Sequence, residues 1–223
     1  LLNTLRPVTS WEWDSVEQYR LVAGWAVTNL AQAAAIVGYK DPEFTRFLVN
    51  VCYPILDWTG GGNWHASFAD SKLAIATYLG DAALYTDAKN YFNTRIAQSF
   101  FHSKYDGNKI VPLRNASGAV MLSITLNHWG GNWGASQVNS DFTFTSAALA
   151  VDGANAERTR DLSHVSMGMA GWMHAARSIV AHGDKLEPQA YDRLLAGYAV
   201  HSKRVLATIT TGVTPAPVPY NGN

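Results

Sequence analysis

The placement of proline and glycine restricts this chain to a helical fold. Stretches without proline carry apolar residues three and four positions apart, as at Tyr19, Ala23, Val27 and Leu30, and this spacing is typical of amphipathic helices. Short turns marked by glycine or proline separate the stretches. The predicted helices cover residues 11–38, 41–57, 64–79, 82–102, 152–183 and 187–208. We therefore predict an all-α fold of antiparallel helix hairpins.

The segment around residues 103–151 has no such periodicity. Within it, 110–112, 120–124 and 141–144 fit either short strands or loop. We expect a single domain over residues 1–214, followed by an extended, proline-rich tail at 215–223.

Composition and charge remove several classes of partner. The 223 residues include 17 Lys or Arg and 17 Asp or Glu, so neither nucleic acid nor an anionic membrane surface is favoured. No apolar run is long enough to span a bilayer. The chain begins with Leu and shows no leader, so either a signal peptide has been removed or this is a piece of a longer chain; we expect a secreted or periplasmic protein. The single cysteine, Cys52, is predicted to be a buried thiol.

Four ionisable residues share one arc of the helix predicted at 152–183. At about 100° per residue, Glu157, Arg160, Asp161 and His164 fall on one line of the helix surface. The line continues into small residues at positions 168, 171 and 175, which allow close approach of another backbone. These four residues fit a functional edge, and they also fit a structural ion network at a helix packing seam.

The glycine-rich stretch at residues 60–67 is the second candidate site. Asn63 offers a donor and an acceptor, and Trp64 offers a flat apolar surface, so the stretch suits a sugar ring. Asn63 is also explained as the N-cap of the helix that follows. His65 lies in the first turn of that helix, whose positive end lowers an imidazole pKa and favours a neutral general base.

A further loop rich in Gly, Trp and Asn contains His128 and Trp129 and is a candidate cleft wall. The sequence has no H-E-x-x-H pair, no G-x-S-x-G elbow and no phosphate-binding glycine loop. We therefore expect neither a metal nor another cofactor.

Several of these motifs occur in an order that resembles the alginate lyase superfamily of polysaccharide lyases. They are Gly62-Asn63-Trp64, the run from Ala74 to Asp81, Asp152-Gly153, Glu157-x-x-Arg160-Asp161-x-x-His164, and the run from Arg193 to Tyr198. The resemblance covers roughly residues 15–210 and implies an (α/α) toroid or incomplete barrel.

The chain also resembles the mannuronate-lyase branch of this superfamily. There an Asn and a His lie close together, as Asn63 and His65 do, and a later helix begins with an Arg that Arg160 matches. That branch has a catalytic Tyr about two turns after the Arg, where this chain has residues 166–168 without a Tyr.

The resemblance implies β-elimination on a uronic-acid polymer, alginate (polymannuronate) first. Asn63 and Arg160 would neutralise the carboxylate beside C5, and His65 or His164 would remove the C5 proton. Glu157 and Asp161 would orient Arg160 and His164, and tryptophans would stack on sugar rings. The candidate donors to the leaving O4 are Tyr53, Tyr105, Tyr198 and Tyr220. The predicted substrate-binding residues are Trp58, Trp64, His128, Trp129, Glu157, Asp161 and Tyr198.

Two other functions remain open. An inverting glycoside hydrolase on an α/α barrel needs two carboxylates about 6.5–9.5 Å apart, and Asp57, Asp70, Asp141 and Glu157 are available. A non-catalytic carbohydrate-binding helical domain would need neither a base nor an acid. For the lyase we expect an acidic polysaccharide substrate, no nucleic-acid or membrane partner, and a monomer.

Overall fold

The computed structural model describes residues 2–11, 18–58, 62–112, 114, 120, 138–157 and 162–212. Its α-helices are α1 (Gln18–Ile36), α2 (Pro42–Arg46), α3 (Asn63–Leu79), α4 (Ala82–Ser99), α5 (Ser103–Asp106), α6 (Leu162–Ala181) and α7 (Pro188–Thr211). Shorter turns of other helix types are η1 (Leu2–Leu5), η2 (Phe47–Cys52), η3 (Tyr53–Ile55) and η4 (Ala147–Leu149). Within these ranges there are isolated β-bridges and no strand. The all-α prediction is confirmed.

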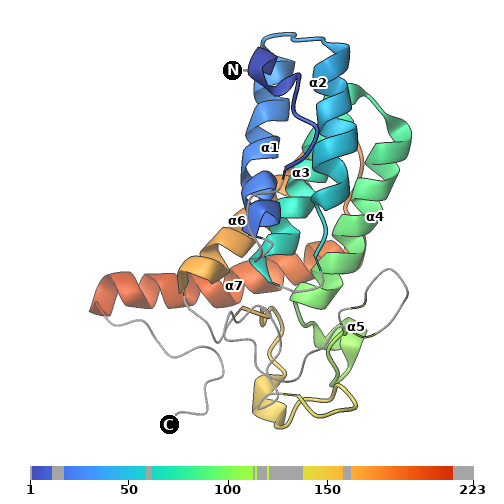
Figure 1. Cartoon of the computed structure of the whole chain (residues 1–223). Helices are drawn as coiled ribbons and strands as arrows, with labels where there is room; N and C mark the ends of the chain where they lie inside the picture. The colour runs from blue at the N-terminus through green and yellow to red at the C-terminus, as the bar shows by residue number, and fades with distance from the viewer. Residues whose placement is uncertain are drawn as a thin grey trace.

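Helix α3 lies at the centre and packs against α1, α4 and α6. Figure 1 shows α1 to α4 roughly side by side, with α7 running across their lower ends. Residues on every side of α3 are buried, as expected for a helix enclosed by others. One apolar cluster, which includes Val27, Phe47 and Ile75, fills the space between α1, η2 and α3.

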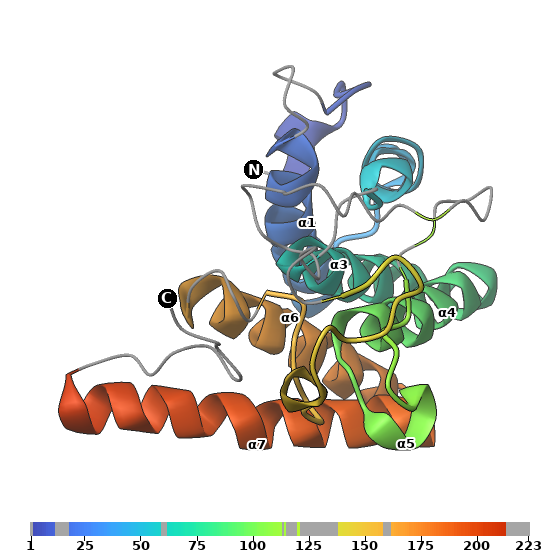
Figure 2. The same cartoon turned by 90° about the horizontal axis from the view of Figure 1, so that it is seen from below.

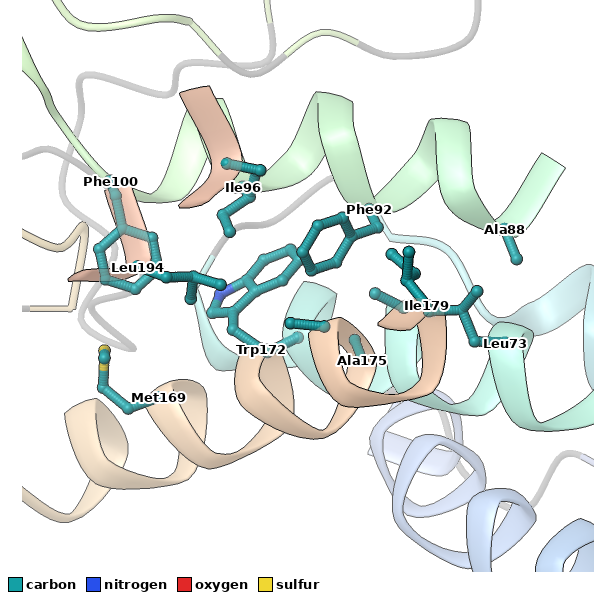
Figure 3. Packing of buried hydrophobic residues seen from close by; sticks show 14 of the residues in the cluster. Leu73, Ala88, Phe92, Ile96, Phe100, Met169, Trp172, Ala175, Ile179 and Leu194 are labelled. Atoms are coloured by element: carbon teal, nitrogen blue, oxygen red, sulfur yellow. The ribbon is translucent and has the colours of Figure 1, made fainter. Parts of the chain in front are cut away.

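A second apolar cluster joins α3, α4, α6 and α7. Figure 3 shows Trp172 of α6 pointing toward Phe92 of α4, with Leu194 of α7 beside it. The Trp172 and Phe92 ring centroids are 5.6 Å apart in an edge-to-face arrangement, one of the geometries that aromatic pairs prefer. This cluster fixes α6 and α7 relative to α3 and α4.

Most of the predicted helix boundaries agree with the structure. Asp41 caps α2 by accepting from the amides of Glu43 and Phe44, and Asp81 caps α4 in the same way. Gly80 ends α3 with a left-handed backbone at φ 65°. The helix predicted at 41–57 is helical from 42 to 55, but its hydrogen-bond pattern changes from α to π to 3-10.

The helix predicted to follow Asp152-Gly153 begins later than expected. Residues 152–157 form turns and a bridge, and the described part of α6 starts at Leu162. Gly153 has φ 83°, and a Cβ there would lie 2.2 Å from the carbonyl carbon of Ala196 in α7. Only glycine fits this contact, so the chain is held against α7 before α6 begins.

The irregular segment predicted around 103–151 is also observed where it is described. Its described residues form only isolated β-bridges, such as those of Lys109 with Thr143 and of Val138 with Phe144. The alternative of short strands at 110–112 and 141–144 is therefore wrong. Residues 121–124 and the tail predicted at 215–223 lie outside the described residues. Hairpins α3–α4 and α6–α7 are present, while closure of a toroid stays a prediction.

Candidate functional site

The first turn of α3 differs from its prediction in a way that changes the role of Asn63. The N-cap is Gly62, at φ 79°, and Asn63 is the first helical residue. Its side chain makes no capping hydrogen bond, and its Oδ1 is buried with no hydrogen-bond partner among the described residues. The N-cap interpretation of Asn63 is therefore wrong. A buried polar atom without a partner is costly, so within the described ranges Oδ1 of Asn63 has an unmet need for a hydrogen-bond donor.

A carboxylate from a distant segment caps this end of α3 instead. Glu157 Oε1 accepts from the Asn63 backbone N–H at 3.0 Å, and Glu157 is 1% exposed. A negative charge at a helix N-terminus is stabilised by the helix dipole. Glu157 therefore does not lie on helix α6 as predicted, but it reaches the same site as Asn63.

His65, one turn into α3, is hydrogen-bonded to a tyrosine that the sequence did not indicate. His65 Nδ1 lies 2.6 Å from the hydroxyl of Tyr91 on α4. The Tyr91 hydroxyl donates to Asp57 Oδ1 at 3.3 Å, and Arg95 Nη2 donates to the same oxygen at 3.0 Å. We assign the single Tyr91 hydroxyl proton to Asp57, because a carboxylate can only accept, and with this assignment His65 Nδ1 is the donor to Tyr91. Nε2 is then the basic nitrogen of His65.

Tyr91 keeps its proton at neutral pH. Burial and the Asp57 carboxylate hold its pKa well above the ordinary value, although Arg95 opposes the rise. Reflection of His65 across the Gly80–Asp81 turn of the α3–α4 hairpin leads to position 96, five residues from Tyr91. The sequence therefore carries no signal that would have identified Tyr91.

A lysine and a second tyrosine extend this polar cluster. Lys72 Nζ lies 4.0 Å from the Tyr53 ring centroid and 3.3 Å from Asp87 Oδ2, and Tyr53 donates to the same oxygen at 2.7 Å. Burial lowers the pKa of Lys72 and raises that of Tyr53. Tyr53, one of the four candidate acids, is thus bound to Asp87.

Two predicted substrate-binding tryptophans meet at the start of α3. The ring centroids of Trp58 and Trp64 are 4.1 Å apart with an interplanar angle of 29°, and both residues are half-buried. They form one stacked pair, so each ring has one face occupied by the other. The pair lies beside Asp57, whose side chain is 49% exposed.

Helix α6 contacts the start of α3 through its small residues, as predicted. A Cβ on Gly168 would lie 3.4 Å from Asn63 Cβ, and one on Gly171 would lie 2.9 Å from Ala66 Cβ. His164 is one turn before Gly168 on the same line of α6, which places it at the Asn63 end of the seam. The structure thus brings Asn63, Glu157 and the His164 turn together.

Other predicted residues lie elsewhere or outside the described ranges. Tyr198 lines an apolar groove of about 220 Å³ between α6 and α7, away from the start of α3. Tyr105 donates to Asp192 at 2.6 Å. The predicted residues outside the described ranges are His128, Trp129, Arg160, Asp161 and Tyr220.

The carboxylates considered for a hydrolase are held in separate environments. Asp57 accepts from Arg95 of α4, and Glu157 accepts from the backbone N–H of Asn63. Asp141 is in the irregular segment, where hydrogen bonds from Thr143 lower its pKa. Asp70 lies within α3, 3.6 Å from His174 of α6, and burial raises its pKa to about 6. The inverting hydrolase, which needs two such carboxylates across a cleft, stays an alternative prediction.

Asn63 and His65 are almost completely buried, at 2% and 1% exposure. The described residues contain no cluster of three His, Cys, Asp or Glu suited to a metal ion. Among the described helices, none has both the length and the hydropathy that crossing a bilayer requires. Comparisons with protein-family models, with curated proteins and with solved structures find no match to this chain.

Proposed function

We propose that this protein is a polysaccharide lyase with an α/α toroid fold. It would cleave a uronic-acid polymer by β-elimination, and polymannuronate is our first choice of substrate. The observation that carries the proposal is the pairing of His65 Nδ1 with Tyr91 at 2.6 Å, in the same first turn of α3 as Asn63, whose side-chain Oδ1 is buried without a partner among the described residues. The first group is an oriented base, and the second is a polar group that needs a partner.

The chemistry follows from these two groups. Asn63 Nδ2 donates a hydrogen bond to the uronate carboxylate beside C5, assisted by Arg160, which makes the C5 proton more acidic, while Asn63 Oδ1 is left to accept from a sugar hydroxyl. His65 Nε2 removes that proton, the electrons form the C4–C5 double bond, and the C4–O4 bond breaks. If the proton and the leaving group are on the same face, His65 can return the proton to O4, so one imidazole completes the proton balance.

Tyr91 and Asp57 are positioning residues in this scheme. Because Tyr91 keeps its proton and donates to Asp57, it fixes the tautomer and the ring orientation of His65. The stacked pair Trp58–Trp64 offers the aromatic surface for a neighbouring sugar ring. Since Asn63 and His65 are nearly buried, a substrate reaches them only if the start of α3 becomes more exposed on binding.

The test is absorbance of the unsaturated uronide with polymannuronate, polyguluronate, glucuronan and hyaluronan as substrates. We expect turnover on at least one polymer, a loss of about 10²–10⁴-fold in kcat for His65→Ala, and retained substrate binding. Tyr91→Phe should lower kcat with little change in KM and should shift its pH profile. His182→Ala, which removes an exposed histidine at the far end of α6, is the matched control.

Three results would contradict this proposal. Reducing sugar without a double bond would indicate a hydrolase, and binding without any product would indicate a carbohydrate-binding domain. Full activity in His65→Ala would show that the base lies elsewhere.

A further inference from the structure

Arg204 of α7 is buried, and two of its three guanidinium nitrogens have no hydrogen-bonding partner among the described residues. The residue is 3% exposed, and its Nε and Nη1 atoms have no hydrogen bond within the described part of the chain. Burial lowers the pKa of Arg204, and no described carboxylate offsets that shift. A buried charge of this kind is strongly destabilising unless it is paired, so an anionic ligand that pairs with Arg204 would relieve this cost.

Arg193, on the same helix, is a buried arginine with a structural role. Arg193 is 1% exposed and forms two hydrogen bonds of 2.6 Å with the carboxylate of Asp106, as well as one to the Phe100 carbonyl. Its charge is therefore neutralised within the fold. Arg204 lies three turns further along the same buried face of α7 and lacks such a carboxylate among the described residues.

The register of α6 and α7 places Arg204 near the proposed site. A Cβ on Gly197 would lie 3.5 Å from Met169 Cε, and Tyr191 and Val180 line the same groove, so the two helices run antiparallel. Two turns beyond Gly197, Arg204 is level with the first turns of α6, where His164 lies. Figure 2 shows α6 beginning and α7 ending on the same side of the molecule.

We propose that Arg204 binds the carboxylate of a uronate residue next to the one that is cut. This inference rests on the proposed function, because it takes the ligand to be the same acidic polymer. A guanidinium group binds a carboxylate through two parallel hydrogen bonds, and the polymer supplies one carboxylate per sugar.

The test uses calorimetric binding of an oligomannuronate and of a neutral oligomannan. His65→Ala serves as the background, so that the ligand is not consumed. We expect Arg204→Met to weaken oligomannuronate binding by about 10- to 100-fold and to leave the oligomannan unaffected. The oligomannuronate affinity of Arg204→Lys should lie between those of the parent and Arg204→Met, since lysine keeps the positive charge but cannot form two parallel hydrogen bonds. Lys203→Met removes a positive charge from an exposed neighbour, and its oligomannuronate affinity should stay within about twofold of the parent's.

Stability separates a binding role from a structural one. Without ligand, Arg204→Met should unfold at the same or a higher temperature than the parent, because it removes an unpaired buried charge. Equal affinity in parent and Arg204→Met, or failure of the parent to bind any oligouronate, would overturn the inference. If Arg204→Met does not fold, then Arg204 is structural unless Arg204→Lys folds and binds more weakly than the parent.

A separate measurement tests the lyase proposal. Formation of the double bond by the wild-type protein decides whether it is a lyase. Loss of oligouronate binding in Arg204→Met, in a protein that forms no double bond, would keep the anion subsite and reject the lyase.

Discussion

Gly171 lies at the closest approach of α6 to α3, so its replacement by alanine tests the packing that positions the site. The added methyl group would lie 2.9 Å from Ala66 Cβ and 3.0 Å from the Ala66 carbonyl carbon. Neither atom can rotate away, so α6 must shift. We estimate an overpacking cost of about 2–3 kcal/mol. Alanine recovers about 1 kcal/mol over glycine in a helix.

The net loss for Gly171→Ala is therefore about 1–2 kcal/mol of unfolding free energy. In a chain of this size that corresponds to a decrease of about 3–6 °C in Tm, measured by circular dichroism. The matched control is Gly168→Ala, whose methyl would lie 3.4 Å from Asn63 Cβ, an ordinary contact. We expect its Tm to be unchanged or up to about 3 °C higher. A Gly171→Ala protein that melts at or above the Gly168→Ala temperature would refute this account of the seam.

Two further substitutions test buried charges. Burial raises the pKa of Asp70 to about 6 from 3.8, against the opposing effect of His174, so the folded protein holds this proton more tightly than the unfolded chain. The difference in Tm between the wild-type protein and Asp70→Asn should fall as the pH rises from about 4 to 6 and should level off above about pH 6. Parallel curves of Tm against pH for the two proteins would contradict the raised pKa. Arg193→Met leaves Asp106 buried without its ion pair and should cost about 3–5 kcal/mol in urea unfolding, whereas the exposed control Arg177→Met should change little. Equal midpoints for these two variants would show that the Arg193 pair contributes no net stability.

The helices were predictable because their signals are local. Proline at the start of α2, Gly80 at the end of α3 and the carboxylate of Asp81 each act within a few residues of their own position. The small residues at 168 and 171 likewise predicted a close helix contact, which the structure places against α3.

The site was only partly predictable, because its contacts join distant segments. Asn63 resembled an N-cap, but Gly62 and Glu157 take that role, and the second of these is 94 positions away. Tyr91 carries no motif and matters only through the α3–α4 hairpin. The buried state of Arg204 also depends on tertiary packing and not on its neighbours in sequence.

The long-range cap on α3 has a consequence for how the protein assembles. The amide of Asn63 finds its acceptor in Glu157, so the first turn of the central helix is completed only after the later half of the chain has been synthesised and has collapsed onto it. Helix content can then return early in refolding, while the end of α3 that bears Asn63 and His65 orders late. Proper arrangement of this end is therefore a sensitive reporter of whether the whole chain has reached its native topology.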